Sequence, residues 1–172
     1  MKDEKIIDKI QKGETELFDS IIRKYYQSIY RFCFYYLDNE QDSLDVTQDV
    51  FVKVYESLQN YDNKGKFKNY LYVIAKNKCK DILKKKTPIS LAEIDLPLVR
   101  NPIMDVENEI AVQQALHELS DKEKEIVILR FYQELKYRDI AEIMKIGIPH
   151  VEYYVKSAMK KMKKYMEGGE KR

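Results

Sequence analysis

The stretch "LKYRDIAEIMKIGIPHVEYYVKSAMKKMKKYM", residues 135–166, decides how the second half of the chain folds. Its first part, "LKYRDIAEIM", has the spacing of a short amphipathic helix, with three residues directed inward: Ile140, Ala141 and Met144. "KIGIP" then interrupts this helix, because Gly147 permits an unusual backbone conformation and Pro149 suits the first turn of a following helix. A long helix over 150–166 completes the pattern. A short helix, a tight turn and a long helix predict a helix-turn-helix unit.

The long helix should have two distinct faces. One face gathers residues that we expect in the core: Val151, Val155, Ala158, Met159, Met162 and Met166. The other gathers His150, Tyr153, Tyr154, Ser157, Lys160, Lys161 and Lys164. A lysine face can be merely solvated. Here, however, the helix follows a tight turn and has His and Tyr in its first helical turn. This pattern favours a recognition helix whose first residues contact base edges and whose later lysines contact phosphates.

A further helix should precede this unit. Ser120 and Glu123 have the spacing of a capping box, so we expect that helix to begin near Asp121.

A second two-faced helix is predicted over residues 67–86, "FKNYLYVIAKNKCKDILKKK". Its inward residues are Phe67, Leu71, Ile74, Ala75 and Ile82. Its outward residues Tyr70, Asn77 and Lys84, which we call the stacking strip, follow one another at heptad spacing and are bordered by Val73, Lys76 and Lys80. Aromatic rings stack on unpaired bases at roughly 1–3 kcal/mol each, and lysines neutralise phosphates. The alternative is an exposed tyrosine beside an ordinary lysine face.

The segment "DSLDVTQDVFVKVYESL", residues 42–58, predicts a helix with an acidic outer face. The inward residues are Leu44, Val50, Phe51, Val54 and Leu58, and the outer ones are Asp42, Asp45, Asp49 and Glu56, with Val52 among them. Such a face fits docking onto a basic helix of another protein. The alternative is a face that only confers solubility.

The distribution of charge separates these two helices. The net charge of the 172-residue chain is only +2, which by itself indicates no partner. Residues 38–62, however, contain seven acidic residues against Lys53, whereas residues 63–86 contain nine lysines against Asp81. An acidic and a basic surface side by side suggest two different partners.

Helical periodicity dominates the chain, and we expect an all-α fold of two small domains. Three of the four prolines fall within residues 88–102, so we place a linker at 88–105 between a first domain at 1–87 and a helix-turn-helix domain at 106–172. The chain lacks an apolar signal core or membrane-spanning run, so we expect a cytoplasmic protein without direct membrane insertion. Cys33 and Cys79 fit no zinc or disulfide pattern.

Nothing in the sequence supports catalysis. His117 and His150 have no serine, cysteine or metal-ligand constellation around them, and no glycine-rich phosphate loop is present. We therefore expect no enzyme, no metal, no cofactor and no small-molecule substrate.

Three segments, in this order, resemble an RNA polymerase sigma factor of the extracytoplasmic-function (ECF) group. "DSLDVTQDVFVKVYESL" resembles region 2.2, and "FKNYLYVIAKNKCKDILKKK" resembles regions 2.3–2.4. "LSDKEKEIVILRFYQELKYRDIAEIM" and the helix after it resemble region 4. The resemblance spans nearly the whole chain. It implies a factor that binds core RNA polymerase, promoter DNA and an anti-sigma factor.

The resemblance also implies roles for individual residues. Contacts with the polymerase clamp would fall on Asp45, Gln48, Asp49, Val52 and Glu56. Recognition of the −10 element and of the melted strand would fall on Asn63, Phe67, Tyr70, Asn77, Lys80, Lys84 and Lys85, with the loop 60–66 capturing a flipped-out base. Recognition of the −35 element would fall on Arg138, His150, Glu152, Tyr153, Tyr154, Lys156, Lys160 and Lys161.

Several positions depart from the family pattern. Tyr70 stands where tryptophan is usual and keeps a stacking face. Lys136 occupies the usual serine cap before the first helix of the motif, and Lys145 replaces the turn glycine. Glu152 stands where a basic residue is expected; it can accept a hydrogen bond from cytosine but repels phosphate.

Two other functions compete with this interpretation. A dimeric helix-turn-helix repressor or activator would bind duplex operator DNA without the polymerase. An RNA-binding regulator would use the same tyrosine and lysine strip, but it leaves the helix-turn-helix unit unexplained.

Overall fold

The computed structural model describes residues 2–86 and 106–169, and within these ranges it contains helices and no strand. The expected all-α fold is therefore confirmed. The chain divides into two compact units, Met1–Ser90 and Leu91–Arg172. The linker expected at 88–105, with its three prolines, lies outside the described residues.

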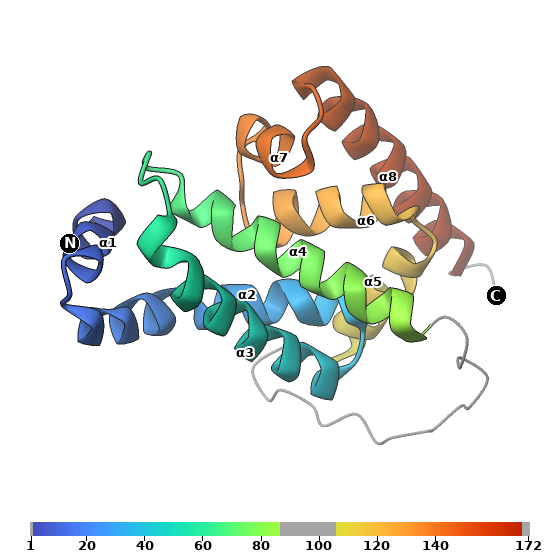
Figure 1. Ribbon diagram of the computed structural model, residues 1–172. Coiled ribbons are helices and arrows are strands. Elements are labelled where there is room, and N and C mark those ends of the chain that lie inside the picture. Colours follow the sequence, from blue (N-terminus) through green and yellow to red (C-terminus); the bar gives the residue numbers. More distant parts are fainter. Residues whose placement is uncertain (1, 87–105, 170–172) are drawn as a thin grey trace. The chain divides into compact units, whose positions relative to one another are not determined.

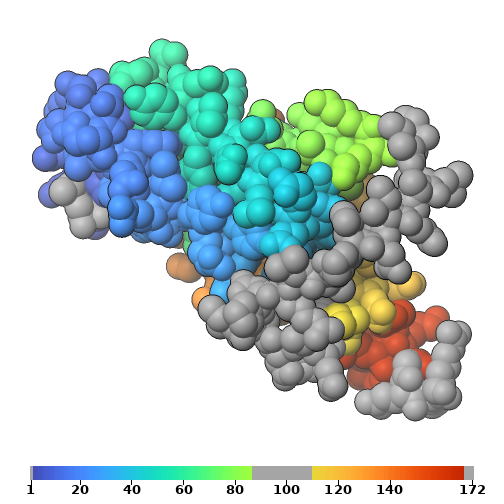
Figure 2. Space-filling view, turned by 90° about the horizontal axis from the view of Figure 1, so that it is seen from below, coloured from blue at the N-terminus to red at the C-terminus, as the bar shows by residue number. Residues whose placement is uncertain are grey.

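The first unit contains four α-helices in its described part. They are α1 (Asp3–Gln11), α2 (Phe18–Leu37), α3 (Glu40–Ser57) and α4 (Phe67–Lys86), with short 3-10 turns at Thr15–Leu17 and Leu58–Asn60. Helices α2, α3 and α4 pack on one another, and α1 lies at one end of the group (Figure 1). From below, α2 and α3 lie side by side on the surface of the unit (Figure 2).

Large apolar and aromatic side chains fill the core between these helices. The fully buried members include Ile21, Ile29, Phe32, Val50, Leu71 and Tyr72. The rings of Phe32 and Tyr72 pack edge to face with centroids 5.6 Å apart. Burial raises the pKa of the Tyr72 hydroxyl above its ordinary value. Cys33 and Cys79 are also completely buried.

A tight turn joins α2 to α3. Asp38 ends α2 in the left-handed conformation, with a φ of 51°. Asn39 then caps α3, because its side-chain oxygen accepts a hydrogen bond of 2.9 Å from the backbone N–H of Asp42. This short connection makes α2 and α3 neighbours in space.

The second unit contains four α-helices among its described residues: α5 (Val106–His117), α6 (Asp121–Val127), α7 (Tyr137–Met144) and α8 (Ile148–Gly169). A π-helical turn, Ile128–Tyr132, continues α6. Helix α6 begins at Asp121 as predicted, and the capping box is present: Ser120 Oγ accepts from the N–H of Glu123, while Glu123 accepts from the N–H of Ser120.

The turn between α7 and α8 differs from the sequence expectation. Lys145, and not Gly147, adopts the left-handed conformation, with a φ of 55°. Lys145 is the C-cap of α7, a position at which many helices end with a left-handed residue. Gly147 lies at the start of α8, where its carbonyl accepts hydrogen bonds from the N–H groups of His150 and Val151. A residue with a side chain costs roughly 1–2 kcal/mol in this conformation, which glycine avoids.

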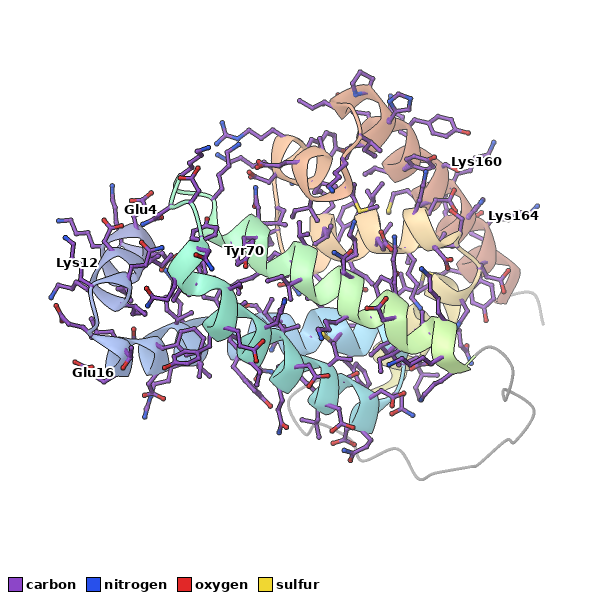
Figure 3. The ribbon with its side chains drawn as sticks, viewed as in Figure 1. Glu4, Lys12, Glu16, Tyr70, Lys160 and Lys164 are labelled. Atoms are coloured by element: carbon purple, nitrogen blue, oxygen red, sulfur yellow. The ribbon has the colours of Figure 1, made fainter. Side chains whose placement is uncertain are left out.

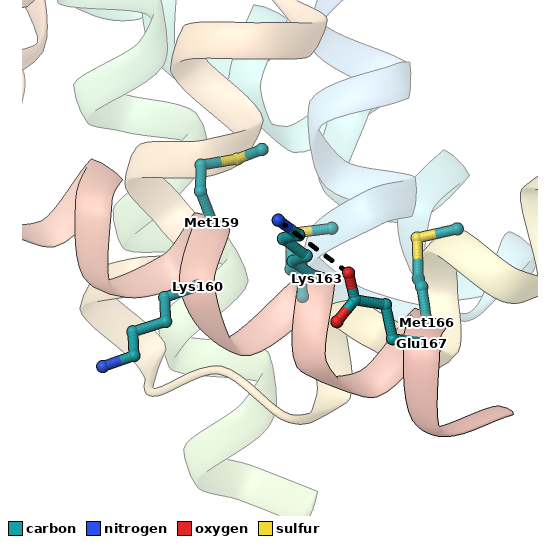
Figure 4. A pocket seen from close by; sticks show the side chains of 6 residues that line it. Met159, Lys160, Lys163, Met166 and Glu167 are labelled. Atoms are coloured by element: carbon teal, nitrogen blue, oxygen red, sulfur yellow. Dashed lines mark ion pairs between the residues drawn. The ribbon is translucent and has the colours of Figure 1, made fainter. Parts of the chain in front are cut away.

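The core face of α8 is shorter than predicted. Val151, Val155 and Ala158 are buried, but Met159 and Met166 are 43% and 51% exposed. Helix α8 has 22 residues and packs on α5, α6 and α7. These helices leave Met159 and Met166 uncovered, and both methionines line an open hollow along α8 together with the ion pair of Lys163 with Glu167 (Figure 4).

Candidate nucleic-acid and protein interfaces

The outer face of α3 presents a continuous acidic surface. We call its members Asp45, Gln48, Asp49, Val52 and Glu56 the acidic strip; all five are exposed, and Val52 is exposed by 57%. The strip faces outward because the opposite side of α3 buries Val46, Val50 and Val54 in the core. An exposed valine between carboxylates provides apolar contact area together with charge complementarity to a basic partner.

Two features next to the acidic strip were not expected. Asp42 is half-buried and accepts a hydrogen bond from Lys86 at the end of α4. The carboxylate of Asp42 is therefore paired with a lysine of its own unit. Tyr55 is 49% exposed, and its ring packs edge to face on Phe18 at 5.1 Å. Tyr55 follows Val52 by three residues, and this helical spacing could have predicted that the two side chains share the outer face of α3.

The stacking strip lies on α4, the helix packed antiparallel to α3. Asn77, Lys84 and Lys85 are exposed, whereas Tyr70 and Lys80 are half-buried. The hydroxyl groups of Tyr70 and Ser57 form a hydrogen bond of 2.5 Å, which joins the start of α4 to the end of α3. Together with the Lys86–Asp42 pair, this bond holds the two helices together at both ends.

Aromatic rings surround Tyr70, and one of them was not anticipated. The Tyr61 ring lies 4.7 Å from the Tyr70 ring, centroid to centroid, and is also partly exposed. Phe67 packs beneath both rings, at 5.7 Å from Tyr61 and 6.2 Å from Tyr70. Only 2% of Phe67 is exposed, because it fills the core below the two tyrosines. Its predicted inward position is confirmed, and the expectation that it contacts DNA is contradicted by this burial.

Lys76 also departs from its expected position. It was placed at the border of the stacking strip, but it is only 9% exposed. Helix α4 packs on both α2 and α3, so a wider part of its circumference is covered than a single apolar stripe indicates.

The loop before α4 turns its asparagine inward. Asn63 Nδ2 donates to the backbone oxygen of Glu4 and to Asp8 Oδ1, both at 2.8 Å, and its Oδ1 is buried. The side chain of Asn63, which was expected to contact DNA at the −10 element, is therefore directed at α1. Lys64 and Lys66 of the same loop are exposed.

The head of α8 presents polar and aromatic groups to solvent. The exposed predicted contacts are His150, Glu152, Tyr153, Lys156, Lys160 and Lys161, together with Arg138 on α7. Tyr153 is 64% exposed, and the half-buried Tyr154 packs edge to face against it at 5.4 Å. Further along, Lys160 and Lys164 project outward from α8 (Figure 3).

One predicted contact of α8 is engaged inside the unit. Glu123, at the start of α6, accepts hydrogen bonds from Ser157 Oγ at 2.6 Å and from Lys161 Nζ at 2.9 Å. Burial raises the pKa of Glu123, but the hydrogen bonds from Ser157, Lys161 and Ser120 outweigh it and lower the pKa to about 2. The sequence identified Glu123 only as a cap, although it also joins α6 to α8.

Within residues 2–86 and 106–169, no group of three His, Cys, Asp or Glu side chains could hold a metal ion. Among these same residues, no helix has the length and apolar character needed to cross a membrane.

Comparisons with known proteins match the two units separately. The family model of Sigma-70 region 2 matches residues 21–88, and the model of Sigma-70, region 4, matches residues 109–162. The RNA polymerase sigma factor SigV of Bacillus subtilis is 31% identical over 118 residues, which cover 68% of this chain and 71% of SigV. The ECF RNA polymerase sigma factor SigW of the same organism is 26% identical over 178 residues, covering 94% of this chain and 95% of SigW.

Two solved structures share the fold. CnrH, in complex with the cytosolic domain of CnrY, matches with a TM-score of 0.79 at 19% identity, over 98% of this chain and 99% of CnrH. The sigma factor RpoE of Bartonella quintana, in complex with the anti-sigma factor NepR, matches with a TM-score of 0.73 at 16% identity, over 87% of this chain and 96% of RpoE.

The matches to both sigma regions argue against a repressor or an RNA-binding regulator, neither of which requires a region-2 unit. The chain belongs to the extracytoplasmic-function group of bacterial RNA polymerase sigma factors, the regulatory subunits that bind core polymerase and direct the initiation of transcription at promoters.

Proposed function

We propose that three helices of this sigma factor bind three different partners. The acidic strip of α3 docks on a basic helix of core polymerase. Helix α4 and the loop before it bind the separated non-template strand at the −10 element. The head of α8 recognises duplex DNA at the −35 element.

The observation that carries this proposal is the antiparallel contact of α3 and α4. The acidic strip and the stacking strip belong to one rigid pair of helices, joined at its ends by Ser57 with Tyr70 and by Asp42 with Lys86. Lysines repel a basic protein helix, and carboxylates repel phosphates. Each strip therefore suits only one of the two partners, and one unit can bind both at the same time.

On α4, Tyr70 and Tyr61 supply the stacking surface. Both rings are partly exposed, and Asn77, Lys84 and Lys85 continue the surface along the helix. Stacking tolerates any base, so sequence preference at the −10 element must come from hydrogen bonds such as those an exposed amide can make.

On α8, His150, Glu152 and Tyr153 are the candidates for base contacts, because they lie in the first turns and are exposed. Lys156 and Lys160 follow on exposed positions suited to phosphate. Glu152 can accept a hydrogen bond from a cytosine amino group. Lys161 contributes less, because it shares its ammonium group with Glu123.

The chain supplies no catalytic group in this scheme, and nucleotide addition belongs to the polymerase. It acts where the polymerase acts, in the cytoplasm. The RpoE structure contains an anti-sigma factor. We propose that a protein of that kind controls this chain by covering its DNA-facing surfaces.

Transcription from defined components tests the proposal. The purified chain is added to sigma-free core polymerase with a library of promoter sequences, and the transcripts are sequenced. Specific start sites with shared upstream elements support the proposed function. A chain that shifts duplex DNA without polymerase, and yields no transcripts, would overturn it.

A further inference from the structure

The N-terminal helix α1 is firmly attached to the core of the first unit. Its own side chains Ile7 and Ile10 are buried. Asp3 accepts hydrogen bonds from Lys24 Nζ, at 2.6 Å, and from the Tyr25 hydroxyl. Burial and the Asp3 carboxylate raise the pKa of Tyr25, so this hydroxyl remains a hydrogen-bond donor. Helix α1 therefore has a fixed position relative to α2.

From this position, α1 holds the segment that connects α3 to α4. Gln11 Nε2 donates to the backbone oxygens of both Leu58 and Tyr61, each at 2.8 Å. Leu58 is the first residue of the 3-10 turn and Tyr61 follows its last residue, so the two carbonyls mark the two ends of the turn. One amide group thus connects the last residue of α1 to both ends of the turn.

Two further contacts continue along the loop. Asn63 Nδ2 donates to the backbone oxygen of Glu4 and to Asp8 Oδ1 on α1, and the Oδ1 atom of the same amide group is buried. Gly65 adopts a φ of 71°, and a Cβ atom on it would lie 2.6 Å from Glu4 Oε1. Glu4 lies on the side of α1 toward the loop, whereas Lys12 lies on the outer side (Figure 3).

We propose that α1 is a positioning helix for the loop 60–66, with Gln11 and Asp8 as the positioning residues. They hold the Tyr61 backbone, and with it the Tyr61 ring, against Tyr70, so that two aromatic rings face the separated strand together. Asn63 belongs to this attachment and does not contact a base. The inference rests on the proposed function of the loop and of Tyr70 in strand capture.

The physical reason is preorganisation. A loop that is already in its binding shape loses less conformational freedom when it binds than a mobile loop does. Each hydrogen bond that fixes the loop contributes about 1 kcal/mol, so loss of both Gln11 bonds raises the open population of the loop by about tenfold or more.

The first measurement concerns the loop alone. Gln11→Met keeps the length of the side chain and removes its donor, and Gln27→Met makes the same change at an exposed position on α2. Hydrogen exchange of the full chain should accelerate about tenfold at the amides of residues 61–66 in Gln11→Met, and not in Gln27→Met. Uniform acceleration throughout the first unit would contradict a local positioning role.

The second measurement concerns promoter opening. With core polymerase and a promoter selected from the library, 2-aminopurine placed in the −10 element reports strand separation, and labelled core polymerase reports affinity. Gln11→Met should slow opening by up to about tenfold, in proportion to the fall in the ordered population of the loop, and leave polymerase affinity within about twofold. Asp8→Ala should act in the same direction, and Asp8→Asn, which keeps an oxygen acceptor for Asn63, should restore opening.

The outcomes separate the two proposals. If the wild-type chain and core polymerase open no promoter, the proposed function fails, and strand positioning by α1 fails with it. If wild type opens promoters and Gln11→Met opens them equally fast, only the role of α1 is overturned. Equal losses of affinity and opening would make α1 a general stabilising element and would also overturn the inference.

Discussion

The two units attach a DNA-facing helix to its neighbour by different chemistry. In the first unit, two neutral hydroxyl groups, of Tyr70 and Ser57, join α4 to α3. In the second, the buried carboxylate of Glu123 joins α6 to α8 through Ser157 and Lys161. Tyr70 keeps part of its ring exposed for a ligand, whereas Glu123 is only 3% exposed.

Because of this difference, the two units should respond differently when these residues are substituted. The first unit can lose one hydroxyl without leaving a charge buried. In the second unit, one carboxylate caps a helix and also holds the recognition helix, so its removal affects the fold before it affects any contact with DNA.

The largest effect is therefore expected at Glu123. Glu123→Ala removes a cap and two hydrogen bonds to α8, which together stabilise the second unit by about 3 kcal/mol. Hydrogen exchange of α8 amides in urea measures this loss, and Glu118→Ala, at an exposed position, is the control. Unchanged protection of α8 would show that the carboxylate is not needed to hold the helix.

The same carboxylate predicts a pH dependence for the second unit alone. Its folded pKa, at about 2, lies below the ordinary value of 4.5, so its stabilising contribution is complete above 4.5 and is lost as pH falls through about 2. The difference in unfolding free energy between wild type and Glu123→Gln should therefore be constant near neutral pH and shrink below 4.5. A difference that grows on acidification would contradict the lowered pKa.

The next effect concerns the acidic strip. Asp49→Lys places a positive charge where a basic partner is expected, and it should weaken binding to core polymerase by about a hundredfold. Titration of labelled core polymerase measures the affinity. Glu16→Lys makes the same charge change at an exposed site of the first unit outside the strip. Equal weakening by both variants would mean that total charge, and not the strip, determines binding.

A smaller effect is expected for the aromatic ring of the stacking strip. Tyr70→Ala should slow promoter opening by roughly thirtyfold, the equivalent of about 2 kcal/mol of stacking, with polymerase affinity nearly unchanged. Tyr70→Phe removes only the hydrogen bond to Ser57 and keeps the ring, so it should open promoters almost as wild type does. If Tyr70→Phe opens promoters as slowly as Tyr70→Ala does, the hydroxyl group and not the ring is needed for opening.

The smallest effects compare the helix caps of the two units. Asn39 caps α3, whereas Lys136 precedes α7 without a side-chain cap. Asn39→Ala should destabilise the first unit by about 1 kcal/mol, and Lys136→Ser should stabilise the second by about the same amount. Urea unfolding of each variant measures both changes. Destabilisation by Lys136→Ser would show that the lysine makes a contact worth more than a cap.

Periodicity and caps predicted most of the helices. The all-α fold, the start of α6 at Asp121 and most of the buried face of α3 follow from apolar spacing and from one capping box. On α4, Phe67, Leu71 and Ala75 are buried as predicted, whereas Ile74 and Ile82 are only half-buried. The exposed methionines could not be predicted, because spacing gives the apolar side of α8 but not which part of that side the other helices cover. The left-handed Lys145 was missed because glycine, two residues later, gives the stronger sequence signal.

The candidate interfaces also contain features that the sequence predicts and features that it does not. Exposure of the acidic strip follows from the helical pattern, and its role in polymerase binding stays a prediction. The directions of Asn63 and Lys161 could not be predicted, because each depends on a partner far along the chain, Asp8 and Glu123. Long-range pairs of polar side chains leave no periodic signal in a single sequence.

The two completely buried thiols of the first unit offer a separate measurement of its integrity. Cys33 and Cys79 are the only cysteines in the chain, and both lie in that unit. A maleimide reagent can reach them only when the unit opens, since the thiolate must be accessible to react. Alkylation rates should therefore report unfolding of the polymerase-binding unit while the helix-turn-helix unit stays invisible to the reagent.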